Sequence, residues 1–213
     1  MQYEAQGSKI FADKTSALMY AGFSAMRRSR GDGDCFYRSL LFVVLEKLCA
    51  THDGAGIAAL KARVTDMADK FVRAGYQPMV VEDPVAALVR MVDGCAVWSA
   101  DELVAAFCSN ELTPYAMWAL RLITATEMKV NADFYSNFLD VPVPVYVDTA
   151  VEPVHSEADH VCIAALCAAL QLRVRVLYLD AQPGPPTDTS VGDDACPLAA
   201  TLLYRPGHYD VLL

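Results

Sequence analysis

The chain has 213 residues, of which 54% are hydrophobic, and its formal net charge is −9. From this length and charge we expect one domain with a substantial core, and no nucleic acid or anionic membrane surface as main partner. A monomer is expected, although the sequence does not determine the oligomeric state. The longest apolar, uncharged run covers residues 161–172, which is too short to cross a bilayer, so no membrane-spanning segment is predicted.

The first predicted element is a helix over residues 8–29. Five apolar side chains can share one broad face of it: Ile10, Phe11, Leu18, Met19 and Met26. An arginine cluster, Arg27, Arg28 and Arg30, lies where this helix ends. The cluster could meet an acidic patch on a substrate or raise the positive potential nearby. A solvated helix C-terminus that complements the helix dipole explains it equally well.

A polar, turn-forming run at residues 31–34 then leads to Cys35, and an apolar, helix-compatible run follows at once. This order predicts a loop that delivers Cys35 to the first turn of a helix reaching about residue 50. Unpaired backbone N–H groups and the helix dipole stabilise an anion there, so a thiolate would be favoured. Gly31 and Gly33 allow the backbone to approach a substrate closely. Cys35 is therefore a candidate nucleophile.

Helical patterns dominate the middle of the chain. Helices are predicted at 57–74, 83–92, 99–109 and 113–129, with a short helix or turn at 134–139. Ser99 and Glu102 form a capping-box pattern, and Asp83-Pro84 gives the start of the 83–92 helix. The prolines of residues 141–145 remove backbone donors and hold φ extended, so this segment is predicted to be an extended connector.

The last part of the chain predicts one buried helix, 159–170, and a small sheet. Strands are expected at 172–179, 198–205 and 208–213, completing an antiparallel sheet, with 180–197 as a loop. Helices first and strands late indicate an α+β domain. On the last strand His208 and Asp210 would share one face, close enough for the carboxylate to orient the imidazole.

A thiol, an imidazole and an orienting carboxylate are the working parts of nucleophilic acyl transfer. Each part also has a structural explanation. A cysteine that opens a helix is often a small core hydrophobe, and His-x-Asp on a terminal strand is often a surface hydrogen-bonding pair. Their occurrence together, with a glycine-rich approach to Cys35, favours the catalytic interpretation.

Both ends of this pattern resemble a known family. Residues 32–38 read Asp-Gly-Asp-Cys-Phe-Tyr-Arg and resemble the nucleophile motif of ovarian-tumour (OTU) cysteine proteases, which remove ubiquitin. Residues 203–210 read Leu-Tyr-Arg-Pro-Gly-His-Tyr-Asp and resemble the otubain branch in particular. Weaker similarities lie at 120–124, 134–138 and 157–160, so the resemblance covers about residues 25–213.

The resemblance implies a papain-like (OTU) fold, in which a helical lobe packs on a small, mainly antiparallel sheet. The whole chain, 1–213, would form one catalytic domain. Residues 1–30 would be an N-terminal helical arm, 31–140 the helical lobe with the nucleophile, and 141–213 the helix and sheet carrying the base. The active site would lie in the cleft between these layers.

The resemblance also assigns roles to single residues. Cys35 would be the nucleophile, His208 its base, and Asp210 the group that holds the imidazole in the correct tautomer. Asp32 would help shape the oxyanion hole through its loop, although a turn or N-cap role is a sufficient structural reason for it.

Two neighbours of Asp32 belong to the same oxyanion loop, Gly33 and Asp34. Asparagine is common in otubains where this chain has Asp34. The additional negative charge is expected to oppose thiolate formation.

The implied activity is hydrolysis of isopeptide bonds in ubiquitin chains or conjugates, with no metal or organic cofactor. The implied partners are ubiquitin, polyubiquitin and, as a second class, ubiquitin-conjugating enzymes. The basic C-terminal tail of ubiquitin would suit an acidic protein. One alternative is a regulator that binds ubiquitin or a conjugating enzyme through an N-terminal arm, of which the first part is expected to be missing here. Another is the same chemistry on a different ubiquitin-like modifier.

Two further motifs receive structural interpretations. The adjacent pair Asp159-His160 precedes a buried helix and is expected to be structural. A metal site built from His155, His160, Cys162 and Cys167 matches no zinc spacing and is not predicted. Seven cysteines without a regular framework, together with no secretion signal at the N-terminus, predict reduced thiols in the cytoplasm, with access to the nucleus.

Overall fold

The computed structural model describes residues 2–213, with side chains from residue 9 onward; Met1, the first residue of the predicted arm, lies outside the described residues. The helices are α1 (Gln2–Tyr20), α2 (Cys35–Thr51), α3 (Gly54–Thr65), α4 (Ala68–Arg73), α5 (Pro78–Gly94), α6 (Ala100–Cys108), α7 (Leu112–Val130), α8 (Ala132–Tyr135), α9 (Val143–Tyr146) and α10 (His160–Leu170), with a 3-10 turn at Ser136–Phe138 and a π-helical turn at Val147–Val151. The strands are β1 (Met26–Arg27), β2 (Arg173–Tyr178), β3 (Thr187–Val191), β4 (Leu198–Arg205) and β5 (His208–Leu212).

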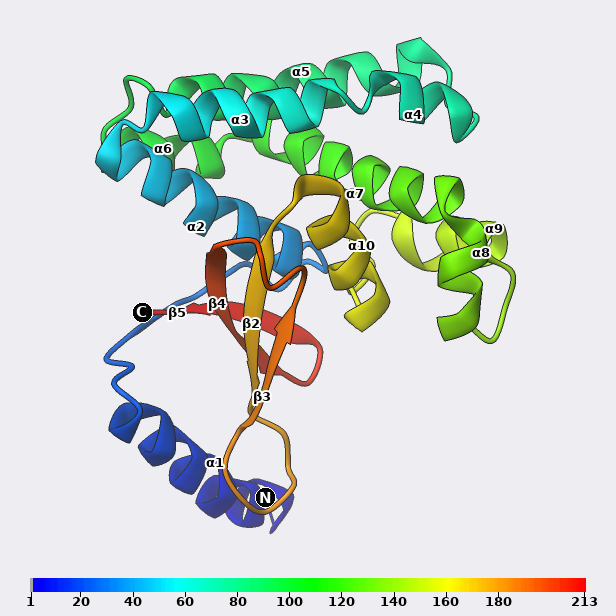
Figure 1. Cartoon of the computed structure of the whole chain (residues 1–213). Coiled ribbons are helices and arrows are strands. Elements are labelled where there is room, and N and C mark those ends of the chain that lie inside the picture. Colours follow the sequence, from blue (N-terminus) through cyan, green and yellow to red (C-terminus); the bar gives the residue numbers. More distant parts are fainter. Residues whose placement is uncertain (1) are drawn as a thin grey trace.

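The architecture is the predicted α+β arrangement. Figure 1 shows α3 to α7 gathered in a helical lobe, with α2 and α10 between that lobe and the sheet. Helix α2 packs against β4 and β5, and its buried face, including Phe36, Tyr37 and Leu45, belongs to a core shared by helices and sheet. This packing puts the first turn of α2 directly against the last strand. Within the described residues, none of the helices is long and apolar enough to cross a membrane.

The sheet has the order β1-β5-β4-β2-β3, and all neighbouring pairs are antiparallel except β2 and β4. The prediction of a mainly antiparallel sheet is therefore confirmed, whereas a fully antiparallel arrangement of the three predicted strands is wrong. The reason is β3, which lies inside the predicted 180–197 loop. It reverses the chain beside β2, so a second reversal brings β4 back parallel to β2.

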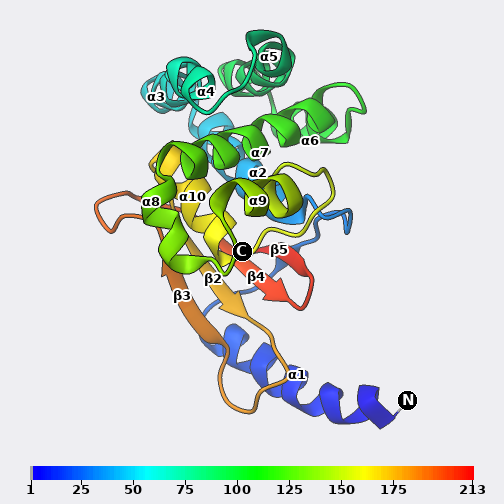
Figure 2. The ribbon, with the colours of Figure 1, turned by 90° about the vertical axis from the view of Figure 1, so that its right-hand side faces the viewer.

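Helix α1 lies apart from the helical lobe, on the far side of the sheet (Figures 1 and 2). A small apolar cluster attaches it there: Leu18, Leu177, Leu179, Leu203 and Leu212. The buried Lys14 ammonium also pairs with Asp180 at 2.6 Å. The predicted 8–29 helix is wrong beyond Tyr20, because Gly22 takes φ +98° and the chain then extends to pair β1 with β5.

Two helix predictions in the middle of the chain need correction. The 57–74 helix is broken into α3 and α4, and the predicted start at Asp83 is wrong because α5 already begins at Pro78, with Pro84 inside it. Pro78 occupies the first helical position, where no N–H is needed. By contrast, α2, α6, α7 and α10 follow the predicted spans closely, and the Ser99–Glu102 capping box is formed.

The predicted extended connector at 141–145 is also wrong. Residues 143–146 form α9, which continues into the π-helical turn. Pro142 is the N-cap of α9 and Pro144 lies in its first turn. The N–H groups missing from these two prolines would have no helical partner at those positions, so alternating prolines are compatible with a helix start.

Candidate active site

Cys35 is the first residue of α2, and the loop of residues 31–34 precedes it as predicted. Its side chain is buried, with 1% of its surface exposed. Strand β5 passes directly over the thiol, because the backbone N–H of Tyr209 lies 3.4 Å from the Cys35 Sγ and donates to it. The nucleophile candidate therefore contacts the strand that carries the candidate base.

His208 and Asp210 interact directly, as the i, i+2 spacing predicts. The His208 Nε2 atom lies 2.9 Å from the Asp210 Oδ1 atom. Asp210 is completely buried, and Oδ1 also accepts the backbone N–H of Ser29 at 2.9 Å. Arg205 donates to the other oxygen, Oδ2. The carboxylate is thus held on both oxygens, and its contact with Nε2 leaves Nδ1 available to take a proton.

The available nitrogen of His208 lies beside Gly31, in the segment before Cys35. A side-chain carbon placed on Gly31 would lie 3.9 Å from Nδ1, so this nitrogen is next to the loop that precedes Cys35. His208 and Cys35, both within the described residues, form no hydrogen bond with each other, since the thiol contacts Tyr209 N–H instead. The structure therefore places the three predicted groups in one site without a direct thiol–imidazole contact.

The local environment opposes ionisation of the thiol. Burial raises the pKa of Cys35, and the negative charges of Glu157 and Asp32 raise it further. Backbone N–H groups of Tyr209 and Phe36 act in the opposite direction but do not outweigh burial. The prediction that a helix N-terminus lowers the pKa of Cys35 is therefore wrong for this structure, because desolvation exceeds the helix-terminus effect.

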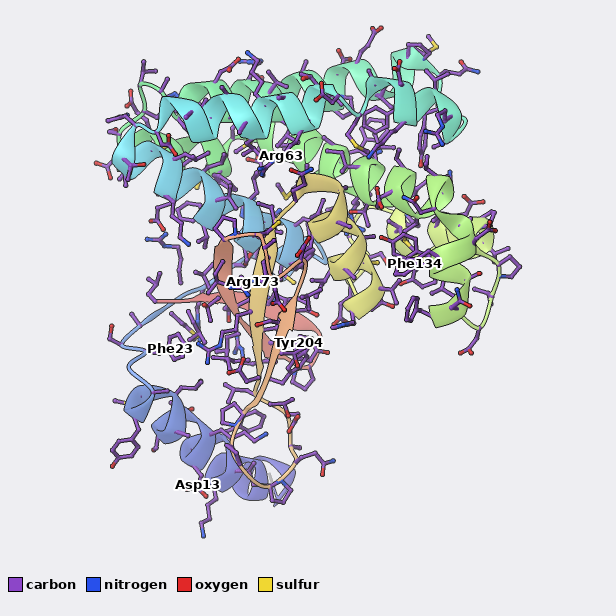
Figure 3. All side chains as sticks on the ribbon, viewed as in Figure 1. Asp13, Phe23, Arg63, Phe134, Arg173 and Tyr204 are labelled. Carbon is purple, nitrogen blue, oxygen red and sulfur yellow. The ribbon has the colours of Figure 1, made fainter. Side chains whose placement is uncertain are left out.

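We expect Glu157→Gln to lower the pKa of the Cys35 thiol, because it removes a negative charge that disfavours the thiolate. Glu157 is exposed, and its carboxylate accepts the hydroxyl of Tyr204 (labelled in Figure 3), so the amide keeps the shape of the contact. The measurement is the rate of alkylation by iodoacetamide against pH, which should shift to lower pH. Asp101→Asn, an exposed residue of α6, is the matched control and should leave the profile unchanged.

Asp32 organises the loop instead of contacting the thiol. Its carboxylate binds the Arg38 guanidinium through two bonds, of 2.7 and 2.8 Å, and accepts the backbone N–H of Asp34 at 3.1 Å. Burial alone would raise the pKa of Asp32, but the bonds and charge of Arg38 hold it below its ordinary value. The predicted turn role is present in the structure, and this turn positions the backbone of residues 33–35.

Asp34 is the N-cap of α2 and lies in a buried ion pair with Arg121, whose Nη2 is 2.6 Å from Oδ1. Among the groups that raise the pKa of Cys35, the acidic ones are Glu157 and Asp32, and Asp34 is not one of them. The Arg121 guanidinium offsets the Asp34 charge within the core, so Glu157 and Asp32 have the larger effects on the thiol, and the expected effect of Asp34 stays a prediction.

The sequence interpretation gave Arg121 no role in the site. This residue has no exposed surface and joins three segments around the nucleophile loop. Its guanidinium donates to the carbonyl oxygens of Gly33, Val151 and Ser156 at 3.3, 2.9 and 2.6 Å, besides its bonds to Asp34. The sequence did contain a signal for this role, because Arg121 is the one charged residue in the apolar helix run 116–123. A charge buried in such a run requires an oppositely charged partner.

Gly33 is required by its position. It has φ +81°, and a side-chain carbon there would lie only 1.9 Å from the carbonyl oxygen of His155. Any other residue would force the loop before Cys35 away from the 153–158 segment. His155 itself has φ +65°, and its Nδ1 lies 3.1 Å from Asp34 Oδ2. The close approach at Gly33 and the Asp34–His155 contact thus fix the two segments relative to each other.

The candidate metal ligands do not form the set weighed from the sequence. Within the described part of the chain, the cluster with suitable atoms is Asp32, Asp34 and His155, whose ligand atoms lie within 4.8 Å of one another. Arg38 and Arg121 already neutralise the two carboxylates. The cluster of Asp32, Asp34 and His155 therefore stabilises the loop.

Asp159, expected to be structural, caps α10 by accepting the N–H of Cys162 at 2.9 Å.

Comparison with known proteins agrees with this geometry. A family model described as "Peptidase C65 Otubain" matches residues 1–213. An OVARIAN TUMOR DOMAIN-containing deubiquitinating enzyme of Arabidopsis thaliana is 31% identical over 229 residues, covering 97% of this chain and 74% of the relative. Human ubiquitin thioesterase OTUB2 is 31% identical over 201 residues, covering 89% and 81% of the two chains.

A solved structure, described as a ceOTUB1 ubiquitin aldehyde UBC13~Ub complex, has the same fold. It superposes with a TM-score of 0.87 at 28% identity, covering 96% of this chain and 85% of that one. The similarity therefore includes both the helical lobe and the sheet.

Proposed function

The chain belongs to the otubain family of cysteine peptidases, and from this premise we propose that it is a deubiquitinating enzyme working as a single catalytic domain. It hydrolyses the isopeptide bond between the C-terminal glycine of ubiquitin and a lysine of another protein or of a second ubiquitin. The observation that carries the proposal is the bonded His208–Asp210 pair on the strand that passes over the Cys35 thiol. The proposed location is the cytoplasm, with access to the nucleus.

In the first half of the reaction Cys35 Sγ attacks the carbonyl carbon of the ubiquitin C-terminal glycine. His208 Nδ1 takes the thiol proton, while Asp210 holds the ring through Nε2. The thiol must first turn from Tyr209 N–H towards the imidazole, because the structure has no direct bond between them. Backbone N–H groups of Cys35 and its loop, shaped by Asp32, stabilise the oxyanion.

In the second half the tetrahedral intermediate collapses and its C–N bond breaks. The leaving lysine amine receives the proton held by His208, and ubiquitin remains as a thioester on Cys35. His208 then takes a proton from a water molecule that attacks the thioester carbonyl. The C–S bond then breaks, the Cys35 thiolate leaves, and His208 returns the proton to it. Ubiquitin is released with a free carboxylate, and the thiol is restored.

The direct test is reaction with ubiquitin that carries a C-terminal electrophile. We expect one adduct of one ubiquitin per chain, seen as a mass shift, and loss of the adduct in Cys35→Ala. Iodoacetamide-treated protein serves as a second control, since it should not react. No adduct despite measurable ubiquitin binding would contradict the catalytic proposal, and a parallel probe based on another ubiquitin-like protein would identify a different modifier.

A second candidate function is regulation by binding a ubiquitin-conjugating enzyme. It is favoured by the structural neighbour, which was solved together with UBC13~Ub. In this proposal helix α1, which a small apolar cluster attaches to the sheet, would serve as the N-terminal arm. Cys35→Ala separates the two functions, because it removes cleavage and leaves binding of a charged conjugating enzyme intact.

A further inference from the structure

A pocket of about 300 Å³ lies beside the active site, between the segment after α1, the first turns of α2, and α6. It has an apolar floor, which includes Phe42, Phe107 and Val211. Four arginines also line it: Arg27, Arg28, Arg30 and Arg38. In a chain of net charge −9, this local concentration of positive charge next to the reacting groups calls for a negatively charged ligand.

The pocket is joined to the reacting groups through Ser29. The backbone N–H of Ser29 donates to Asp210 at 2.9 Å, and its hydroxyl donates to the carbonyl oxygen of Cys35 at 3.4 Å. Arg28 and Arg30 are the residues on either side of Ser29. Val211, which follows Asp210, lines the pocket as well. The arginine pocket therefore lies next to the Asp210 carboxylate and the first turn of α2, within a few residues of the reacting groups in the chain.

The four arginines differ in how they are compensated. Arg27 pairs with Glu46 at 2.5 Å and lies over the Phe42 ring, and Arg38 is held by Asp32. Arg28 and Arg30 are exposed, and neither forms an ion pair with another described side chain. Two guanidinium groups thus remain available at the rim, and the planar fork of arginine suits a carboxylate.

The opposite end of β5 has the opposite charge. Glu157 accepts the hydroxyl of Tyr204, and a side-chain carbon on Gly207 would lie 3.8 Å from its carboxylate. Gly207 precedes His208 at the start of β5, whereas Val211 at the other end of the strand lines the arginine pocket. At about 3.3 Å per residue, these positions are separated by roughly 10 Å or more. A basic tail suits the first end and an acidic segment suits the second.

We propose that the arginine pocket is a specificity site for the leaving side of the substrate, and that it binds Asp or Glu side chains flanking the modified lysine. The inference rests on the proposed function and identifies a substrate class for it. The basic ubiquitin tail occupies the Glu157 side, and the acidic segment of the second protein occupies the Arg28–Arg30 side. The apolar floor covers the aliphatic part of that segment.

The test uses ubiquitin joined through its C-terminus to the lysine of short peptides that differ only in flanking residues, Asp and Glu in one series, Asn and Gln in the other. Wild-type protein should hydrolyse the acidic series about 5-fold faster in kcat/KM, a typical size for two exposed charge contacts. The double variant Arg28→Gln, Arg30→Gln should reduce this ratio to about 1. Because the contacts are exposed, raising the salt concentration should reduce the wild-type ratio too.

The matched control is Arg73→Gln, an exposed arginine of α4 outside the pocket, which should keep the wild-type ratio. A ratio of two rates on one protein preparation is insensitive to partial unfolding of a variant. Equal rates for both series in wild-type protein, or an unchanged ratio in the double variant, would overturn the inference and leave the proposed function standing. Failure to cleave any conjugate, with no adduct to the electrophilic ubiquitin, would overturn both.

Discussion

Replacing Cys35 by alanine is expected to abolish hydrolysis of ubiquitin chains, with a loss of about 10,000-fold or more in kcat. The physical reason is that the Cys35 sulfur is the atom that forms the thioester with ubiquitin in the proposed reaction. The thiol at the start of α2 accepts the backbone N–H of Tyr209, the residue that follows the candidate base His208 on β5. Without the sulfur no thioester forms, and what remains is at most direct attack by water. Di-ubiquitin cleavage under single-turnover conditions measures the effect.

The control for this variant is a second cysteine replacement. Cys196→Ala removes a partly exposed thiol in the loop between β3 and β4 and should retain wild-type activity. Circular dichroism and thermal unfolding should be close to wild type for both variants, since each change removes one small atom. Chain cleavage by Cys35→Ala at a rate comparable to wild type would disprove the assignment of the nucleophile.

The second large effect is expected in stability. Arg121→Met should lower the free energy of unfolding by about 3–5 kcal/mol, the range for breaking a buried ion pair by removing one partner. Asp34 would keep its charge in the core without the Arg121 guanidinium, and the carbonyl groups of Val151 and Ser156 would lose a donor. Urea denaturation followed by fluorescence measures this loss of stability. Activity should fall as well, because the bond from Arg121 to the Gly33 carbonyl oxygen in the nucleophile loop is lost.

A double variant separates two effects of losing Arg121: the uncompensated charge on Asp34 and the lost packing of the arginine side chain. Arg121→Met with Asp34→Asn removes both charges, so it should recover part of the stability lost in the single variant. The exposed change Arg73→Met should cost less than about 0.5 kcal/mol. If the single and the double variant unfold at the same urea concentration, the ion pair does not hold the nucleophile loop in the way that we infer.

The sequence was most informative where local chemistry decides the structure. A glycine-rich turn before an apolar helix run identified the environment of Cys35, and the period of a strand was enough to place His208 beside Asp210. The capping box at Ser99 and Glu102 is also local, since both partners lie within one helical turn. These features depend on residues a few positions apart, so periodicity and turn chemistry describe them without knowledge of the fold.

Local propensity failed where a signal had two structural meanings. The prolines at 142 and 144 fit an extended segment and also the start of a helix, and the structure adopts the helix. The short strand β1 could not be recognised, because two residues carry no period and Met26 and Arg27 extend only to pair with Leu212 and Val211. The strand β3 was missed for a similar reason, since its polar, exposed residues resemble a loop.

The sequence by itself thus determined the kind of chemistry, the nucleophile candidate and the base with its carboxylate. Only the tertiary structure decided the electrostatics of the site. Arg121 compensates Asp34 from 87 positions away in the chain, and burial raises the pKa of Cys35 although a helix begins there. Charge compensation and desolvation depend on which distant segments pack around a group, and this packing has no counterpart in the local order of the residues.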